Sequence, residues 1–275
     1  MHPQGAGGEA DDVEQAFAER HATATVLRGD AGAVLRGLPG ASVHACVTSP
    51  PYWGLRDYGE PGQMGLERTP EEYVRRLVEV LGEVRRVLRG DGTLWLVLGD
   101  CYAGSGKGGG PEPKQLVGVP WRVAFALQAD GWWLRSDVVW SKPNAMPEPV
   151  TDRPTRAHEY VFLLSPSPVY FYDRVAVMRP HAASSLRRLR RYEYGLHHRA
   201  APAPEGSMGS KRDTGIGDCE RMGDFERPMA SLRDVWTVTV GHGVEGHFAT
   251  MPEALVETCV LAGASGGGAA GRAGP

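Results

Sequence analysis

The pattern of apolar and polar positions first predicts alternating strands and helices. Thr23–Arg28 (TATVLR) reads as a strand, Ala31–Leu38 as a short helix and Ser42–Thr48 as the next strand. A strand, a helix and a second strand in this order indicate a parallel sheet, whose strands present their carboxyl ends to one crevice. Asp30 and Ser49 both fall at such strand ends.

The clearest helix of the sequence comes next. Thr69 is a suitable N-cap, Pro70 fits the first turn and Glu72 completes a capping box. We expect Gly90 to end this helix. Seven apolar residues recur at helical spacing before that point, namely Tyr73, Leu77, Val80, Leu81, Val84, Val87 and Leu88.

The remaining periodicity predicts further strands and helices of the same α/β fold. After a turn at Asp91–Gly92, the nearly continuous apolar run Thr93–Leu98 is typical of a strand that is buried on both faces. Further strands are expected at Trp132–Trp140, His158–Leu164 and Asp234–Val240, and helices at Val119–Ala129 and Glu253–Leu261.

Composition places the chain among ordinary globular proteins. Its 275 residues are 41% hydrophobic and 23% charged, and the net charge of −3 means that any nucleic-acid surface must be local. Four widely spaced cysteines favour free thiols over a disulfide framework or a metal site. No apolar run is long enough to span a bilayer, so we expect a cytoplasmic protein that does not bind membranes.

Two glycine-rich or basic segments interrupt the regular pattern. Gly104–Pro113 (GSGKGGGPEP) lacks the Gly-Lys-Ser/Thr ending of a phosphate-binding loop, so a simple loop is expected there. Residues 179–230 lose apolar periodicity and contain clustered arginines beside histidines and tyrosines, a composition that suits contacts with phosphates and guanine edges. A solvated insertion is the alternative. The arginines that we select as candidate DNA contacts are Arg187, Arg188, Arg190 and Arg191.

These changes divide the chain. We expect a flexible leader at residues 1–22, an α/β domain at 23–178 that resumes at 231–263, a basic insertion at 179–230, and a disordered tail at 264–275.

The stretch from Val47 to Tyr58 carries the candidate chemistry. Two consecutive prolines cannot donate to a sheet, so the chain must leave the strand at Thr48–Pro51. Methylating the amino group of a nucleobase requires acceptors for the amino hydrogens, an aromatic face for the extruded base and an aligned methyl donor. The Ser49 hydroxyl and the Pro50 carbonyl are suitable acceptors, and Tyr52 can stack on the base. A proline-rich structural loop is the alternative.

Thr48-Ser49-Pro50-Pro51-Tyr52-Trp53 resembles the catalytic motif of the S-adenosylmethionine-dependent, amino-specific DNA methyltransferases, in the permuted order that places this motif before the cofactor motif. The serine form is usual for N4-cytosine enzymes and the aspartate form for N6-adenine enzymes. The resemblance covers about residues 23–263. It continues through Gly99-Asp100, Trp140–Asn144, His158-Glu159-Tyr160 and His247–Pro252.

The resemblance implies a Rossmann-like fold, with helices on both faces of a mostly parallel sheet, and a role for each matching residue. It also implies that the α/β domain is catalytic and that the insertion 179–230 is the target-recognition region. Ser49, Pro50, Pro51 and Tyr52 would hold the target base. Trp53, Trp140, Lys142 and Asn144 would line the pocket or the nearby DNA, and Asp30, His247, Phe248 and Thr250 would bind the cofactor. Each has a structural alternative: Trp140 as core, His247 as a loop cap and Asp30 as the cap of the Ala31 helix.

One expected motif is missing from the sequence. In this family a strand that ends in Phe-x-Gly-x-Gly binds the methionine side of S-adenosylmethionine, but here Glu253–Leu261 leads into a Gly/Ala-rich segment. Our hypothesis is a truncated, frame-shifted or split gene product whose sheet is incomplete at the C-terminus. A complementing C-terminal fragment is then a candidate partner.

The sequence therefore predicts transfer of a methyl group from S-adenosylmethionine to the N4 amino group of cytosine in duplex DNA, with a restriction endonuclease as a further candidate partner. N6-adenine methylation is the alternative within the class. A catalytically inactive DNA-binding fragment, or one half of a split enzyme, is the alternative from another class. A small-molecule or RNA methyltransferase is a third possibility, which the basic insertion disfavours.

Overall fold

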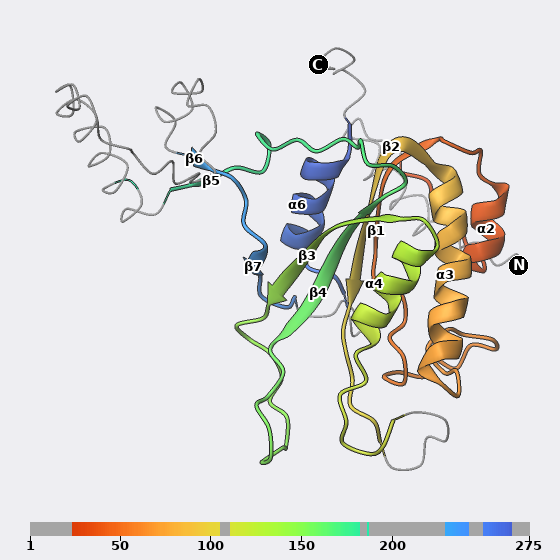
Figure 1. Cartoon of the computed structure of the whole chain (residues 1–275), viewed down its shortest axis with the longest axis vertical. Coiled ribbons are helices and arrows are strands. Elements are labelled where there is room, and N and C mark those ends of the chain that lie inside the picture. Colours follow the sequence, from red (N-terminus) through yellow and green to blue (C-terminus); the bar gives the residue numbers. More distant parts are fainter. Residues whose placement is uncertain (1–23, 105–110, 182–185, 187–228, 242–249, 266–275) are drawn as a thin grey trace, which may run out of the picture.

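The computed structural model describes residues 24–104, 111–181, 186, 229–241 and 250–265. Their core is a five-stranded sheet of order β1-β2-β4-β3-β7 (Figure 1). β1 pairs with β2, and β3 with β7, in parallel, whereas β4 is antiparallel to both of its neighbours. Four strands therefore share one direction. The strands are β1 (Val43–Thr48), β2 (Leu88–Leu98), β3 (Trp133–Ser141), β4 (His158–Ser165) and β7 (Val235–Thr237).

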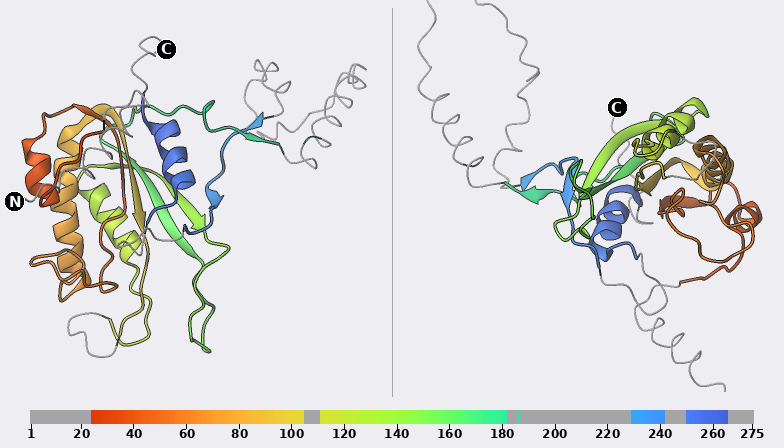
Figure 2. Two further views of the ribbon diagram at one scale, coloured as in Figure 1. Left: turned by 180° about the vertical axis from the view of Figure 1, so that it is seen from behind. Right: turned by 90° about the horizontal axis from the view of Figure 1, so that it is seen from below.

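Helices cover both faces of this sheet, as expected for the predicted fold class. α3 and α4 lie on one face, with α2 beside α3, and α6 lies on the opposite face (Figure 2). The helices are α2 (Ala31–Gly37), α3 (Pro70–Val87), α4 (Val119–Ala129) and α6 (Glu253–Gly263).

β2 joins the two hydrophobic cores because its side chains alternate between the faces. Leu94, Leu96 and Leu98 pack in the core under α3 and α4, whereas Trp95 and Val97 pack in the core under α6. Every residue from Thr93 to Leu98 is buried, so the prediction of a strand covered on both faces is confirmed.

The prediction of a first strand at Thr23–Arg28 is wrong for the residues that the structure describes. Residues 24–28 form no strand, and the side chains of Val26 and Leu27 are 91% and 55% exposed. Strand composition alone does not stabilise an extended segment, because a strand needs a paired neighbour and a covered face.

Two other boundaries differ from the prediction. α3 ends at Val87 rather than Gly90, and Leu88 to Gly92 already belong to β2 instead of forming a turn. The chain before β1 explains this, because the Ser42 N–H donates to the Val87 carbonyl and Val43 pairs with Leu88. β7 covers only Val235–Thr237 of the strand that was expected at 234–240.

The ends of the basic insertion lie side by side. β5 (Arg179–Pro180) pairs antiparallel with β6 (Met229–Ala230), so the chain leaves and returns at one place. Most of the insertion, together with the leader 1–22 and nearly all of the tail 264–275, lies outside the described residues. In the part of the chain that the structure describes, no helix is long and apolar enough to cross a membrane.

Candidate functional site

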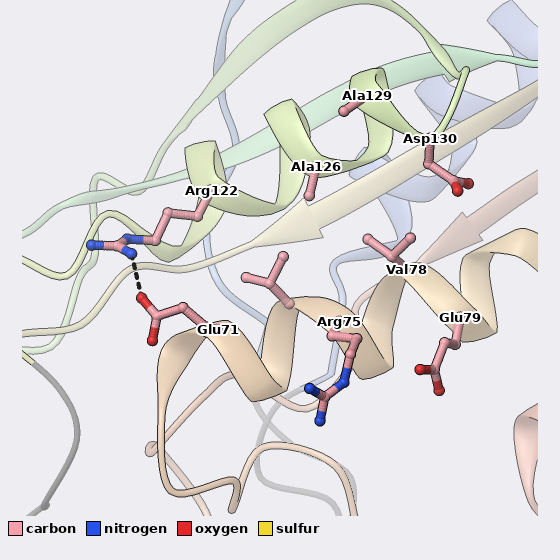
Figure 3. A pocket seen from close by; sticks show the side chains of 9 residues that line it. Glu71, Arg75, Val78, Glu79, Arg122, Ala126, Ala129 and Asp130 are labelled. Carbon is pink, nitrogen blue, oxygen red and sulfur yellow. Dashed lines mark hydrogen bonds and ion pairs between the residues drawn. The ribbon is translucent and has the colours of Figure 1, made fainter.

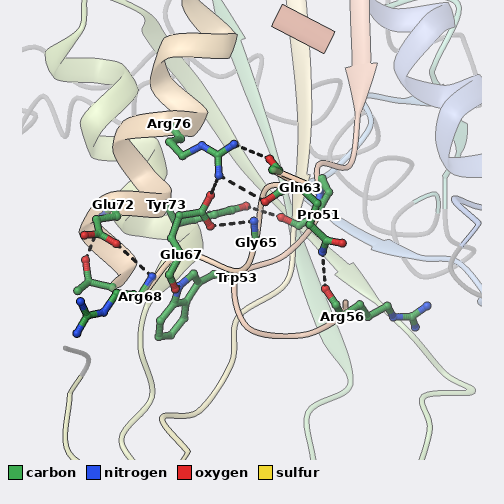
Figure 4. A network of polar contacts seen from close by, with 12 residues as sticks. Pro51, Trp53, Arg56, Gln63, Gly65, Glu67, Arg68, Glu72, Tyr73 and Arg76 are labelled. Atoms are coloured by element: carbon green, nitrogen blue, oxygen red, sulfur yellow. Dashed lines mark hydrogen bonds and ion pairs between the residues drawn. The ribbon is translucent and has the colours of Figure 1, made fainter. Parts of the chain in front are cut away.

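The loop that follows β1 is fastened to the start of α3. The Glu72 N–H donates to the Thr69 hydroxyl at 3.1 Å, and the Arg68 N–H donates to the Glu72 carboxylate at 3.1 Å. The first bond confirms Thr69 as the N-cap, whereas the Glu72 carboxylate reaches back to Arg68, one residue before the N-cap, and so departs from the predicted capping box. α3 is thereby a fixed support for the proline loop that precedes it (Figure 4).

Glu67 organises this loop from a buried position. Its side chain is only 4% exposed, and its carboxylate accepts from Arg76 at 2.5 Å and from the Gly65 N–H at 2.8 Å. The Glu67 carbonyl also accepts the indole N–H of Trp53 at 3.0 Å. Gly65 has φ +98°, and a Cβ there would lie 2.9 Å from the Tyr52 carbonyl oxygen, so this close approach needs glycine.

Tyr73 holds the proline pair itself. Its hydroxyl, brought in by α3, donates to the Pro51 carbonyl at 3.0 Å. Burial raises the pKa of Tyr73, so the hydroxyl keeps its proton and remains a donor at neutral pH. The conformation of the loop beside Ser49 is therefore set by a buried hydrogen bond as well as by the two proline rings.

A chain of polar contacts links the serine of the motif to β3 and β4. The Ser49 hydroxyl donates to the Tyr52 hydroxyl oxygen at 3.3 Å, and the Tyr52 hydroxyl donates to the Glu159 carboxylate at 2.8 Å. Lys142 forms an ion pair with the other oxygen of that carboxylate. Burial, followed by the charge of Glu159, raises the pKa of Tyr52 well above its ordinary value.

The Tyr52 ring lies against backbone at the end of β2. A Cβ on Gly99 would lie 2.7 Å and 2.9 Å from two carbon atoms of this ring, which is closer than van der Waals contact. Glycine at position 99 therefore makes room for the ring. The neighbouring Asp100 carboxylate accepts the N–H groups of Gly118 and Val119 and so caps the start of α4.

Several other predicted site residues have structural roles. Trp53 and Trp140 are 3% and 4% exposed and belong to the two hydrophobic cores. The Trp140 indole N–H donates to the Val238 carbonyl, and its ring lies 4.2 Å from the Lys142 ammonium. Their burial agrees with the core alternative that was considered for Trp140, and a contact of either ring with the pocket or the DNA stays a prediction. Asn144 exchanges two hydrogen bonds with the Val240 backbone.

The predicted cofactor residues are only partly described. Asp30 accepts the Ala33 N–H at 2.9 Å and caps α2, which is the structural alternative considered for it. Thr250 is partly buried close to Gly241. His247 and Phe248 lie outside the described residues, as do Arg187, Arg188, Arg190 and Arg191.

A groove of about 510 Å³ lies elsewhere, between α3 and α4 (Figure 3). Apolar side chains from both helices, including Val74, Val78 and Ala126, form its floor, and the Glu71–Arg122 ion pair closes one end. None of the lining residues belongs to the Ser49 network, so we do not assign the candidate chemistry to this groove.

The arrangement places the Ser49 hydroxyl next to the hydroxyl of Tyr52, whose ring is fixed between Gly99 and Glu159. Sequence reasoning selected Ser49, Pro50, Pro51, Tyr52 and Lys142 but gave no role to Glu159 or Tyr73. Glu159 appeared only inside a matched segment, and Tyr73 only as an apolar helix position. Only the packing of α3 and β4 against the loop reveals their hydroxyl and carboxylate contacts.

Comparisons with known proteins agree with this geometry. A family model described as a DNA methylase matches residues 43–269. The chain is 40% identical over 259 residues to the Type II methyltransferase M.Cfr9I of Citrobacter freundii, covering 87% of this chain and 72% of that protein. It is 37% identical over 278 residues to the Type II methyltransferase M.SmaI of Serratia marcescens, covering 94% and 81%.

A solved structure shows the same fold at low sequence identity. The PvuII DNA methyltransferase (cytosine-N4-specific) matches with a TM-score of 0.56 and 16% identity, over 86% of this chain and 69% of that one. This likeness supports the arrangement of strands and helices.

Proposed function

Because the chain belongs to the N6/N4 family of DNA methyltransferases, we propose that it methylates the N4 amino group of a cytosine flipped out of duplex DNA. The methyl donor is S-adenosylmethionine, the cofactor of these enzymes. The observation that carries the proposal is the orientation of Ser49, whose hydroxyl hydrogen is engaged by Tyr52 while its oxygen stays able to accept.

The chemistry of the acceptor follows from the amino group itself. The lone pair of an exocyclic amino nitrogen is delocalised into the ring, and it becomes nucleophilic when acceptors hold the amino hydrogens out of the ring plane. The Ser49 oxygen and the Pro50 carbonyl are these acceptors, and Tyr52 fixes the base with its ring. Positioning of this kind, rather than a covalent enzyme intermediate, accounts for the catalysis.

Cytosine is preferred to adenine because of the residue that opens the motif. Serine stands at position 49 where the aspartate form of the motif is more typical of N6-adenine enzymes. The two amino groups pose the same chemical problem, so the N6 atom of adenine is the alternative target.

The described residues carry the acceptor side of this reaction. Of the proposed cofactor ligands, Asp30 caps α2 and Thr250 is partly buried, while His247 and Phe248 lie outside the described part. The Asp30 carboxylate has a second oxygen that the helix cap does not use, so the residue is compatible with a ribose or amine contact.

The partners follow from the family. We propose duplex DNA contacts through the basic insertion 179–230, and a restriction endonuclease of the same sequence specificity as the cognate partner, since the relatives carry Type II names. A separate fragment with the Phe-x-Gly-x-Gly motif is a further candidate partner.

Identifying the modified nucleoside tests this proposal. The chain is incubated with unmethylated genomic DNA and labelled S-adenosylmethionine, with and without a fragment that carries the glycine motif, and the DNA is digested to nucleosides. Labelled N4-methylcytosine is expected. Labelled N6-methyladenine would show that adenine is the target base. DNA binding without labelled nucleoside in either reaction would indicate a DNA-binding protein that does not methylate.

A further inference from the structure

Glu159 and Lys142 form a partly buried ion pair directly behind the Ser49–Tyr52 contact. Glu159 lies in β4 and Lys142 follows the last residue of β3, and these strands pair so that Ser141 is opposite His158. The two side chains are only 17% and 16% exposed. A partly buried ion pair is costly to desolvate, so its position at the end of the catalytic loop calls for a role beyond folding.

The chemistry of the groups fixes the direction of each hydrogen bond between Ser49, Tyr52 and Glu159. A carboxylate is an acceptor only, and an ammonium group is a donor only. The single hydrogen of the Tyr52 hydroxyl must therefore point to Glu159, since the 2.8 Å bond joins it to an ionised carboxylate. The Tyr52 oxygen is then an acceptor, and the hydrogen that it accepts comes from Ser49 at 3.3 Å.

We propose that Glu159, held by Lys142, is a positioning residue that acts through Tyr52 to make Ser49 a hydrogen-bond acceptor toward the amino group of the target base. The inference rests on the proposed function and adds to it. With its own hydrogen directed to Tyr52, Ser49 presents only lone pairs to the substrate. A serine hydroxyl without this constraint rotates freely and can turn its hydrogen toward the amino group.

The surroundings of Tyr52 favour this arrangement over competing ones. Its neighbours with titratable or charged groups are Glu159, Tyr73 and, through Glu159, Lys142. Tyr73 donates its hydroxyl hydrogen to the Pro51 carbonyl and therefore does not compete for Glu159. The Lys142 ammonium lies over the Trp140 ring as well, which fixes the end of the ion pair that is farther from Ser49.

The substitution Glu159→Gln tests the direction of the relay. Lys142 can only donate, so it selects the amide oxygen and turns the amide NH₂ toward Tyr52. The Tyr52 hydroxyl then accepts from Gln and donates to Ser49, which reverses the relay. We expect kcat for DNA methylation to fall on the order of 10- to 100-fold with little change in KM.

A double-mutant cycle separates this role from a merely structural one. Tyr52→Phe keeps the aromatic ring but removes the relay, so adding Glu159→Gln to Tyr52→Phe should cost at most about twofold more. Glu83→Gln, which removes an exposed ion pair with Arg86 on α3, is the matched control and should leave kcat unchanged. Equal losses from Glu159→Gln in both backgrounds would overturn the proposal, as would full activity of the single variant.

A spectroscopic readout keeps the test independent of methyl transfer. The carbon-13 signal of the Tyr52 phenol carbon, identified by its loss in Tyr52→Phe, should titrate at lower pH in Glu159→Gln, because the carboxylate charge that raises the Tyr52 pKa is gone. An unmoved midpoint would refute the contact. If wild type transfers no methyl group, the proposed function fails while this titration still decides the relay. If Glu159→Gln does not fold, unchanged kcat in Tyr52→Phe overturns the proposal.

Discussion

Replacing Gly99 with alanine should damage the site more than the fold. The added Cβ would lie 2.7 Å from one Tyr52 ring carbon and 2.9 Å from another, and 3.4 Å from a Glu159 carboxylate oxygen. Carbon atoms pack at roughly 3.5–4.0 Å, so the shorter contact is too close by about 0.8 Å. Tyr52 cannot retreat freely, because its hydroxyl is bonded to Glu159.

The expected cost follows from this overlap. Inserting a methyl group into a packed site costs about 1–3 kcal/mol, and moving the ring is the easiest way to relieve it. If that energy is lost from the aligned state of the loop, kcat falls roughly 5- to 150-fold, since each factor of ten is about 1.4 kcal/mol. The apparent affinity for S-adenosylmethionine should change little.

Single-turnover methylation of DNA measures this effect, and urea unfolding measures stability in parallel. Gly90→Ala is the matched control, because Gly90 lies in β2, the strand that Gly99 directly follows, and a Cβ on Gly90 meets nothing within 4 Å. Wild-type methylation by a folded Gly99→Ala variant would refute the placement of Tyr52. An equal loss in Gly90→Ala would show that the effect is not specific to the ring contact.

Four further predictions concern the packing of α6 and the support of the proline loop. Gly263→Ala should lower the free energy of unfolding in urea by at least about 1–3 kcal/mol, because a Cβ there collides with the Thr93 hydroxyl under α6; wild-type stability would contradict that packing. Burial raises the pKa of Cys259 to about 12, so alkylation by iodoacetamide at pH 8 should be slow in the native protein and fast in urea; rapid native labelling would contradict its burial. Since the folded state prefers the protonated Cys259 thiol, the stability that this preference contributes is full below about pH 9 and is lost as the pH rises toward 12. Between pH 8 and pH 10.5, the free energy of unfolding in urea should therefore fall less for Cys259→Ala than for wild type. Tyr73→Phe should reduce kcat about 5- to 10-fold with a small change in stability, because the Pro51 carbonyl loses its donor; unchanged methylation would show that the loop does not need this bond.

The sequence predicts the frame of this fold where local patterns and tertiary packing agree. The N-cap of α3 and the apolar run in β2 were predictable because each depends on residues close together in the chain. The end of α3 was not, because the pairing of Val43 with Leu88 extends β2 through a segment that reads as a turn. Thr23–Arg28 has the composition of a strand, but composition does not supply a neighbour.

The sequence predicts the motif residues of the candidate site but not the residues that hold them in place. Ser49 and Tyr52 are adjacent in sequence and carry a recognisable pattern, whereas Glu159 reaches them across 107 positions of the chain. Trp140 reads equally well as a pocket wall and as core, and its burial and its contact with the Lys142 ammonium could not be read from the sequence. Long-range contacts of this kind leave no periodic signal in one sequence.

The most direct test of the central claim compares wild type with Ser49→Ala in the nucleoside assay, with any cofactor fragment that proves necessary present in both reactions. Ser49→Ala removes the proposed acceptor and leaves the proline loop, the Tyr52 ring and the Tyr73 contact in place. We predict labelled N4-methylcytosine with wild type and a loss of at least about 100-fold with Ser49→Ala, while DNA binding is unchanged. Equal yields of N4-methylcytosine from both proteins, or label only in adenine, would contradict the account.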